Sequence, residues 1–412
     1  MQKTSRPLIF WLLILSIGFY CLDYFFRISP SLVLIQLMQQ YHTNPFGISL
    51  FASAFYIGYL IFQIPAGLIL DHYQLLRSLI VIILLCILSF ILFIFSHQFY
   101  IGIILRLMIG VTSACSFIGV LYIARVFIKA QYFTFISGLT IAIGTLTASF
   151  IQIINAYLLN FLTWHATLTL FSFLGVLVVI FLLLIPDKQL IPNFHYEPLP
   201  VSDTLKNITQ LISNKAFFLN SMIGGLFYLP TSLLTAVWGI SFFKSSYHIP
   251  ITHASSMIFM VFIGWAIGSP FIGLLADSFK YPRVLVTLLA CCAALSIWLV
   301  LFEANFIGSF LPLLLFLFGL FSSSQVMVWH NFHKICPQKL SGIGIASTNM
   351  LIMLFVAIAH PLVGYMINLG YQKQLFLSTN SYLYGLSLIP WMFLLGILLV
   401  WCFKPLPIKS YQ

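Results

Sequence analysis

Long apolar runs separated by short polar turns dominate the sequence. Crossing a membrane as a helix takes roughly 20 apolar residues, and about twelve runs are long enough. In lipid a backbone must satisfy its own hydrogen bonds, so these runs are predicted to be helices. The predicted spans are residues 8–37, 46–69, 78–96, 99–128, 133–159, 165–186, 216–243, 252–275, 284–303, 306–333, 341–368 and 381–403. We therefore predict an all-α membrane protein with about 12 transmembrane helices.

One longer polar stretch lies near the middle of the chain. Residues 187–214 follow Pro186, contain further prolines and hold Asp187, Glu197 and Asp203, a large share of the seven acidic residues. Polar segments with prolines typically connect structural elements. We interpret this stretch as a cytoplasmic linker between an N-terminal six-helix bundle, 1–186, and a C-terminal six-helix bundle, 215–412. Within it, residues 201–211 are predicted to form a short helix on the membrane surface.

A short motif occurs twice, each time in a turn between two apolar runs. Each copy has a glycine, an aspartate and an arginine: Gly67, Asp71 and Arg77 in the first copy, and Gly273, Asp277 and Arg283 in the second. Each residue of the second copy follows its counterpart by 206 positions, half of the 412 residues. The chain is therefore predicted to contain two copies of one unit. Each copy places an acid and a base where two helices meet the membrane face.

The composition excludes other classes of protein. Hydrophobic residues make up 61% of the chain and charged residues 6%, whereas a soluble domain has about a quarter charged residues. The net charge is +11, but with a cytoplasmic N-terminus only Lys244 and Lys373 fall outside the cell, and Arg27 and Arg106 fall within spans. This asymmetry is typical of membrane topology. We therefore expect both termini in the cytoplasm and no binding of nucleic acid.

Three charged residues lie inside predicted spans. Asp23 is the only carboxylate well within a span, and Arg27 follows it at i+4 on the same helix face. Arg106 lies in the fourth span. A charge in the bilayer interior costs several kcal/mol and indicates a functional site. We predict that Asp23 couples transport to protons and that Arg27 and Arg106 bind an anionic group of a substrate. The alternative is a structural ion pair between Asp23 and one arginine.

The second half offers neutral polar and aromatic residues on spans seven and ten instead of charges. The predicted substrate contacts there are Tyr228, Trp238, Gln325, Trp329 and His330, with hydroxyl groups of neighbouring serines and threonines between them. His330 and His333 are three residues apart, but no third ligand accompanies them, so no metal is expected. His360 is interpreted as a packing residue.

Catalytic machinery is not evident in the sequence. There is no phosphate-binding loop of the G-x-x-x-x-G-K-[ST] type, no Ser-His-Asp spacing and no pair of carboxylates. The seven cysteines include no C-x-x-C motif and are interpreted as apolar packing residues. We therefore predict no catalytic residue, no cofactor and no enzymatic activity.

The repeated motif resembles the G-x-x-x-D-x-x-G-[RK]-[RK] signature of the major facilitator superfamily of transporters. The family glycine before the basic pair is absent here, since Gln74 or Leu75 stands at that place in the first copy. The resemblance implies two parallel six-helix halves that hold substrate between them at the bilayer midplane. It also implies that both copies of the motif help to close the cytoplasmic side.

Two further stretches support this resemblance. The fourth span, with Arg106, Gly110 and Ala114 at intervals of four, is similar to a pattern of that span in the superfamily. Residues 24–30 and 238–243 resemble a bacterial branch similar to the lysosomal dipeptide transporter-like proteins, although organic-anion branches share related first-span patterns.

These features predict a secondary active transporter that works by alternating access. We expect proton-coupled symport of a small anionic or zwitterionic solute, such as an organic acid, an amino acid or a short peptide. The expected setting is the lipid bilayer of a bacterial inner membrane, with the protein a monomer. A passive facilitator or uniporter, an exporter, a membrane-embedded enzyme and a non-transporting receptor remain alternatives.

Overall fold

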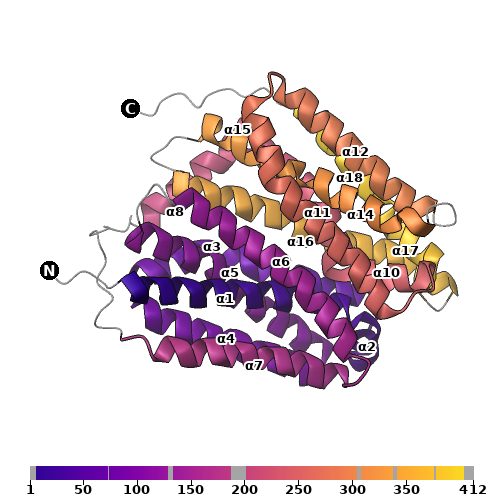
Figure 1. Cartoon of the computed structure of the whole chain (residues 1–412), viewed down its shortest axis with the longest axis horizontal. Helices are drawn as coiled ribbons and strands as arrows, with labels where there is room; N and C mark the ends of the chain where they lie inside the picture. The colour runs from indigo at the N-terminus through magenta and orange to yellow at the C-terminus, as the bar shows by residue number, and fades with distance from the viewer. Residues whose placement is uncertain are drawn as a thin grey trace. The chain divides into compact units, whose positions relative to one another are not determined.

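The computed structural model is all-helical (Figure 1). It describes residues 6–72, 74–128, 133–186, 201–303, 308–336, 341–374 and 377–402. Within these ranges, 12 helices are long and apolar enough to cross a membrane. The helical membrane fold predicted from the apolar runs is therefore confirmed. Most of the predicted linker, residues 187–200, lies outside the described residues.

The chain forms two compact units. Unit 1 comprises Met1–Ser29 and Ala54–Leu199, and unit 2 comprises Pro30–Ser53 and Pro200–Gln412. The domain boundaries expected from the repeat, at 186 and 215, stay a prediction.

Unit 1 is built from long helices that pack side by side. These are α1 (Arg6–Ile28), the later part of α3 (Pro45–His72), α4 (Leu75–Phe95), α5 (Phe99–Phe127), α6 (Phe133–Leu158) and α7 (Trp164–Leu183). Helix α1 contacts α5, α6 and α7, and α4 packs between α5 and α7. Figure 1 shows α1, α4 and α7 running alongside one another. Helix α1 therefore lies at the centre of the unit's contacts.

Unit 2 contains more, and shorter, elements. They are α2 (Leu34–Gln40), the start of α3, α8 (Val201–Ser213), α9 (Lys215–Leu233), a π-helical turn η4 (Leu234–Trp238), α10 (Gly239–Ser246), α11 (Ile251–Ser278), α12 (Pro282–Phe302), a 3-10 turn η5 (Gly308–Phe310), α14 (Leu311–Ser322), a 3-10 turn η6 (Ser323–Val326), α15 (Met327–Ile335), α16 (Ser341–Gln374), α17 (Thr379–Leu386) and α18 (Leu388–Cys402). Helix α9 packs against α16 and α18, and α14 against α11 and α12.

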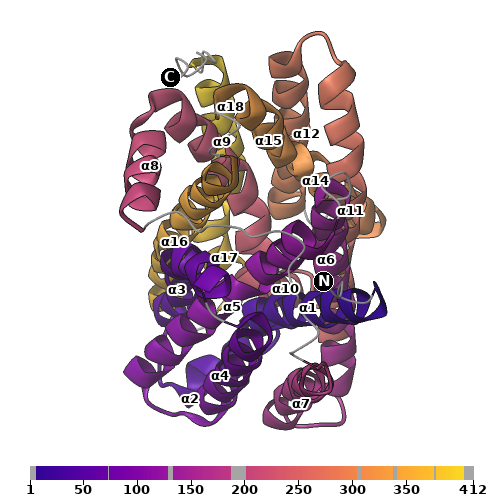
Figure 2. The same ribbon diagram turned by 90° about the vertical axis from the view of Figure 1, so that its left-hand side faces the viewer.

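The short helix predicted for residues 201–211 is present as α8. It packs against α9 and α16 (Figure 2), with Ile208 and Leu211 buried and Leu205 exposed. Its one-sided burial agrees with an amphipathic helix.

The first span ends earlier than the apolar run predicts. The run continues to residue 37, but α1 ends at Ile28, a 3-10 turn η1 follows at Ser29–Ser31, and α2 is a separate helix. Pro30 explains the break, because proline has no N–H and cannot continue the i to i−4 hydrogen bonding of a helix. The carbonyl of Phe26, four residues earlier, consequently loses its helical partner.

A second freed carbonyl joins α3 to α16 within unit 2. Pro361 of α16 leaves the carbonyl of Ala357 without a helical N–H, and Ser53 Oγ donates to that carbonyl at 2.6 Å. One turn earlier on α3, Ser49 lies so close to Gly364 that any β-carbon there would overlap its side chain. The first turns of α3 are therefore closely packed on α16.

Two predicted spans of the second half are interrupted by turns that are not α-helical. In η4, the N–H of Gly239 donates to the carbonyl of Leu234, five residues earlier, and glycine permits this approach because a β-carbon would overlap that carbonyl. Where α14 passes into η6, the hydroxyls of Ser322 and Ser323 donate to backbone carbonyls of the preceding turn at 2.6 Å. Such bonds compete with the helical N–H groups. π-Helical turns are frequent at functional sites.

Close glycine contacts bring α3 and α5 together in unit 1. A β-carbon at Gly58 would overlap the backbone carbonyl of Leu107, and one at Gly110 would overlap that of Phe55. Small residues of this kind let membrane helices approach until their backbones touch.

The same arrangement joins α11 and α14 in unit 2. A β-carbon at Gly264 would overlap the carbonyl of Phe316, and one at Gly319 would overlap that of Val261. Gly264 follows Gly58 by 206 residues, the offset of the repeated motif. The repeat seen in the sequence therefore extends to a helix pair with the same reciprocal packing.

Candidate functional site

Two opposite charges meet inside unit 1, on one face of α1. Arg27 Nη2 donates to Asp23 Oδ2 at 3.0 Å, and Ser116 Oγ of α5 donates to the same oxygen at 3.2 Å. The Asp23 side chain is 0% exposed and that of Arg27 is 6% exposed. Because a buried charge without a partner costs several kcal/mol, direct hydrogen bonds are what allow both groups to be here. The i, i+4 spacing in the sequence thus produces a buried ion pair.

Aromatic rings surround the Arg27 guanidinium group. The ring centroids of Tyr24 and Tyr59 lie 5.0 Å from its Cζ atom, with those of Phe55 at 5.4 Å and Tyr56 at 6.0 Å. The negative faces of such rings attract a cation. Three of the four rings belong to α3, which the glycine contacts bring against α5. This aromatic cage was not predicted from the sequence, because a run of aromatics does not reveal which helix it will face.

Arg106 of α5 is directed at the backbone of α1. Its Nη1 donates to the carbonyl of Phe26 at 2.7 Å, and its Nη2 lies 3.5 Å from the carbonyl oxygen of Arg27. The first of these is the carbonyl that Pro30 frees. Arg106 is 1% exposed, so its charge replaces the missing N–H at the break in α1. Its predicted contact with a substrate stays a prediction.

In unit 2, the π-helical turn η4 presents a buried donor. The Trp238 side chain is fully buried, and its Nε1 atom has no hydrogen-bond partner. The hydroxyl of Thr231, two turns earlier, also lacks one. Buried polar groups without partners are rare and call for an explanation. Both groups are suited to bond a ligand.

The other predicted contacts of unit 2 lie on neighbouring elements. Tyr228 is half-buried on α9, Gln325 is buried on η6, and Trp329 and His330 are half-buried on α15. Helix α9 contacts both η6 and α15, so these elements are neighbours within unit 2. Whether these side chains bind a substrate stays a prediction.

His360 was interpreted as a packing residue, and it is fully buried on α16. Its ring Nε2 lies 3.3 Å from Ser232 Oγ of α9. The sequence analysis missed this partner, since nothing in the pattern aligns the two helices. Among the described residues, no group of three or more His, Cys, Asp or Glu side chains could hold a metal ion.

Both copies of the repeated motif lie where one long helix ends and the next begins. Gly67 and Asp71 are in the last turns of α3 with Arg77 exposed at the start of α4, and Gly273 and Asp277 are in the last turns of α11 with Arg283 half-buried at the start of α12. The side chains of both aspartates lie outside what the structure describes. A β-carbon at Gly67 would meet nothing within 4 Å, and one at Gly273 would meet only Val326, at 3.9 Å.

Comparisons with known proteins identify one family. A family model described as Major Facilitator Superfamily matches residues 13–360. A search of curated proteins found no match.

Among solved structures, the nucleoside transporter NupG aligns with a TM-score of 0.75 at 14% identity, covering 96% of this chain and 99% of its own. A bacterial homologue of the human lysosomal transporter Spinster, inward-facing and unoccupied, aligns at 0.74 and 12% identity, covering 97% and 96%. A D-xylose–proton symporter aligns at 0.74 and 12%, covering 97% and 100%. At sequence identities of 12–14%, this structural similarity shows only that the fold is shared.

Proposed function

The chain belongs to the major facilitator superfamily, and we propose that it is a secondary active symporter that moves a small anionic or zwitterionic solute together with protons. The family and the structural neighbours are transporters, so the protein is a multi-pass membrane transporter and not an enzyme. The buried pair of Asp23 and Arg27 carries the finer proposal.

The proposed coupling follows from two opposing effects on the protonation of the Asp23 carboxyl group. Burial favours the neutral acid, whereas the guanidinium group of Arg27 at 3.0 Å favours the carboxylate. A substrate anion that binds Arg27 competes for the charge that keeps Asp23 ionised. Asp23 then takes up a proton, so substrate and proton bind together and are released together. The name of one structural neighbour, a D-xylose–proton symporter, gives support for proton coupling in this fold.

The proposed substrate class rests on the buried charge of unit 1. Arg27 supplies positive charge for a carboxylate or another anionic group, and its aromatic cage fixes the guanidinium group in place. Within unit 2, the Trp238 Nε1–H and the Thr231 hydroxyl lack hydrogen-bond partners and suit the polar groups of a solute. Organic acids, amino acids and short peptides carry an anionic group that suits Arg27.

The setting of the protein is also a proposal. The distribution of lysines and arginines supports cytoplasmic termini, and we place the chain in a bacterial inner membrane as a monomer. The two motif copies would then close the cytoplasmic side during alternating access. Replacing Asp71 by Asn should favour the inward-open state and raise labelling of cysteines introduced at cytoplasmic-half positions of spans four and ten.

Uptake into proteoliposomes tests the function. Peptides, amino acids and organic acids are screened with and without an inward pH gradient, and the best solute is used with the variants. Asp23→Asn should abolish accumulation driven by the gradient and leave counterflow exchange largely intact. Glu303→Gln, which removes an acid from an exposed position at the end of α12, is the matched control. Accumulation that persists in Asp23→Asn would place the coupling elsewhere, and a neutral substrate that tolerates Arg27→Gln would refute the substrate class.

A further inference from the structure

A small pocket in unit 2 is lined by side chains other than the predicted substrate contacts. It is enclosed by α9, α12, η6, α15 and α18, with apolar walls that include Ile223, Phe227 and Val286. Its volume is about 50 Å³. A pocket for a whole small molecule usually has a volume of about 300–1,000 Å³. This pocket therefore fits a few waters, or one polar group of a larger molecule that stays outside.

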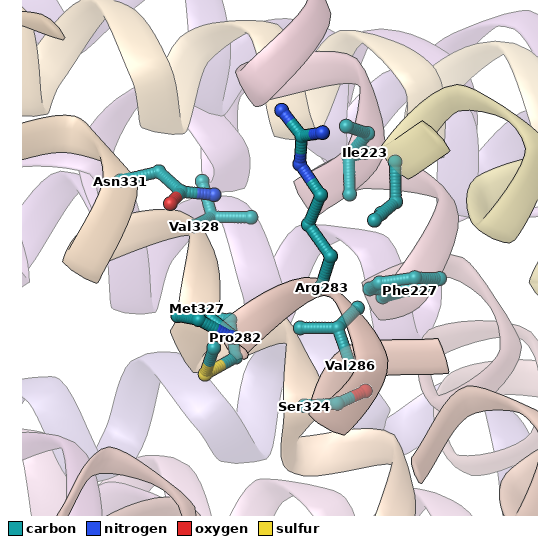
Figure 3. A pocket seen from close by; sticks show the side chains of 10 residues that line it. Ile223, Phe227, Pro282, Arg283, Val286, Ser324, Met327, Val328 and Asn331 are labelled. Carbon is teal, nitrogen blue, oxygen red and sulfur yellow. The ribbon is translucent and has the colours of Figure 1, made fainter. Parts of the chain in front are cut away.

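Three polar side chains line the pocket. Ser324 of η6 is 0% exposed, and its Oγ atom has no hydrogen-bond partner. Arg283 of α12 and Asn331 of α15 are half-buried. Figure 3 shows the guanidinium group of Arg283 at the opposite end of the pocket from the Ser324 hydroxyl, with the Asn331 amide beside it. The pocket thus combines a positive charge, an amide and a buried hydroxyl that lacks a partner.

The helix that carries Arg283 adds to the positive potential. Helix α12 begins at Pro282, which lines the pocket, and its first turn contains no acidic residue. The N-terminal end of a helix carries a partial positive charge, which favours anions. The N–H groups of Val284 and Leu285 are occupied by the Tyr281 carbonyl, so the contribution of this end is its partial charge. Together with Arg283, this end of α12 favours an oxyanion in the pocket.

The surroundings of the pocket are those of a membrane boundary. Lys280 is exposed and lies 5.5 Å from the ring centroid of Tyr281, which is also exposed. On α18, Trp401 is 55% exposed and donates through Nε1 to Thr287 of α12 at 3.1 Å. Exposed tryptophan, tyrosine and lysine side chains of this kind mark the level of lipid head groups. Further along α12, Leu288 and neighbouring apolar side chains are exposed and can contact acyl chains.

We propose that this pocket binds the phosphate group of an anionic phospholipid. Arg283 and the start of α12 hold the phosphate, Asn331 donates to one of its oxygens, and Ser324 bonds the deepest polar group, directly or through a water. The glycerol and acyl chains remain outside, over the exposed apolar side chains. A free phosphate ion presents the same oxyanion chemistry, but it would gain nothing from the apolar surroundings.

Native mass spectrometry of the delipidated full-length protein tests the proposal. Phosphatidylglycerol and phosphatidylcholine are added at equal concentration, and the bound lipids are counted. We expect phosphatidylglycerol to bind in preference, and Arg283→Gln to weaken its binding about fivefold, the effect expected for one basic side chain near a lipid surface. Ser324→Ala should weaken it as well, with little change in side-chain volume. Lys373→Gln is the matched control. Lys373 is an exposed cation of unit 2 that contacts Tyr384 and does not line the pocket.

Each outcome decides the question. Preference for phosphatidylglycerol that falls in Arg283→Gln and Ser324→Ala, and not in Lys373→Gln, supports the lipid site. Equal binding of both lipids, or binding that neither pocket variant changes, overturns it. Displacement of phosphatidylglycerol by an equal concentration of inorganic phosphate would identify a soluble anion as the ligand and also overturn it. Should Arg283→Gln fail to fold, Ser324→Ala alone gives the answer.

Discussion

Replacing Arg106 should destabilise the protein mainly because of the proline that breaks α1. Arg106 donates at 2.7 Å to the Phe26 carbonyl, which Pro30 deprives of its helical N–H. A hydrogen bond that involves a charged group contributes roughly 1.5–3 kcal/mol. Ser29 Oγ also donates to this carbonyl, at a longer 3.2 Å, and can keep part of that stabilisation. We therefore expect Arg106→Gln to lower the free energy of unfolding by about 1.5–2.5 kcal/mol.

A double-mutant cycle isolates the cause. Pro30→Ala restores an N–H that can bond the Phe26 carbonyl, so Arg106→Gln should cost less in that background than alone. We expect a coupling energy of about 1 kcal/mol or more, as for other residues that share a partner. The free energy of unfolding is measured by titrating the protein from mixed micelles into sodium dodecyl sulphate. Arg106→Lys keeps a positive charge and serves as the control for charge alone. If the changes in unfolding free energy of the two single variants simply add in the double variant, Arg106 acts independently of the proline and the reasoning is refuted.

Three further predictions concern single sites. Gly110→Ala should destabilise the protein by at least 1–3 kcal/mol, because its β-carbon would overlap backbone atoms. Gly67→Ala should leave the stability unchanged. Equal melting temperatures of the two variants would contradict this prediction. Trp238→Phe removes a buried donor that has no partner, so stability should be kept or raised while the Kd for the transported solute rises; an unchanged Kd would exclude Nε1 as a ligand. Burial raises the pKa of the Cys336 thiol to about 11, so only roughly one molecule in a thousand is thiolate at pH 8. Maleimide labelling of Cys336 should therefore be slow and should accelerate as the pH rises towards 11, and fast labelling at pH 7 would contradict the burial.

The sequence predicted the parts of the fold that depend on local pattern. Apolar runs located the twelve candidate spans of the described residues, since lipid requires helices wherever such runs occur. The spacing of Asp23 and Arg27 placed both side chains on one face, and the structure pairs them at 3.0 Å. Gly110 and Gly319 were visible as small residues in spans four and ten, and both lie at backbone contacts.

Features that depend on two helices at once were not predictable from one sequence. Pro30 was visible, but the donor that replaces its N–H belongs to α5, about three spans later in the chain. Three of the four rings of the aromatic cage come from α3, and their role depends on how closely that helix approaches α5. The π-helical turn at Trp238 was also not predicted. The same apolar run is compatible with a regular α-helix and with a helix that has one extra residue in a turn.

The open space beside the two motif glycines has a practical use. A β-carbon at Gly67 meets nothing within 4 Å, and one at Gly273 meets only a valine methyl group at 3.9 Å. Cysteines at these two positions would accept nitroxide labels without disturbing the packing around them. The native cysteines that are exposed, Cys291, Cys292 and Cys402, would first be changed to serine. Pulsed electron paramagnetic resonance on such a pair would then read the distance between the two copies of the motif, with and without a solute, through a full transport cycle.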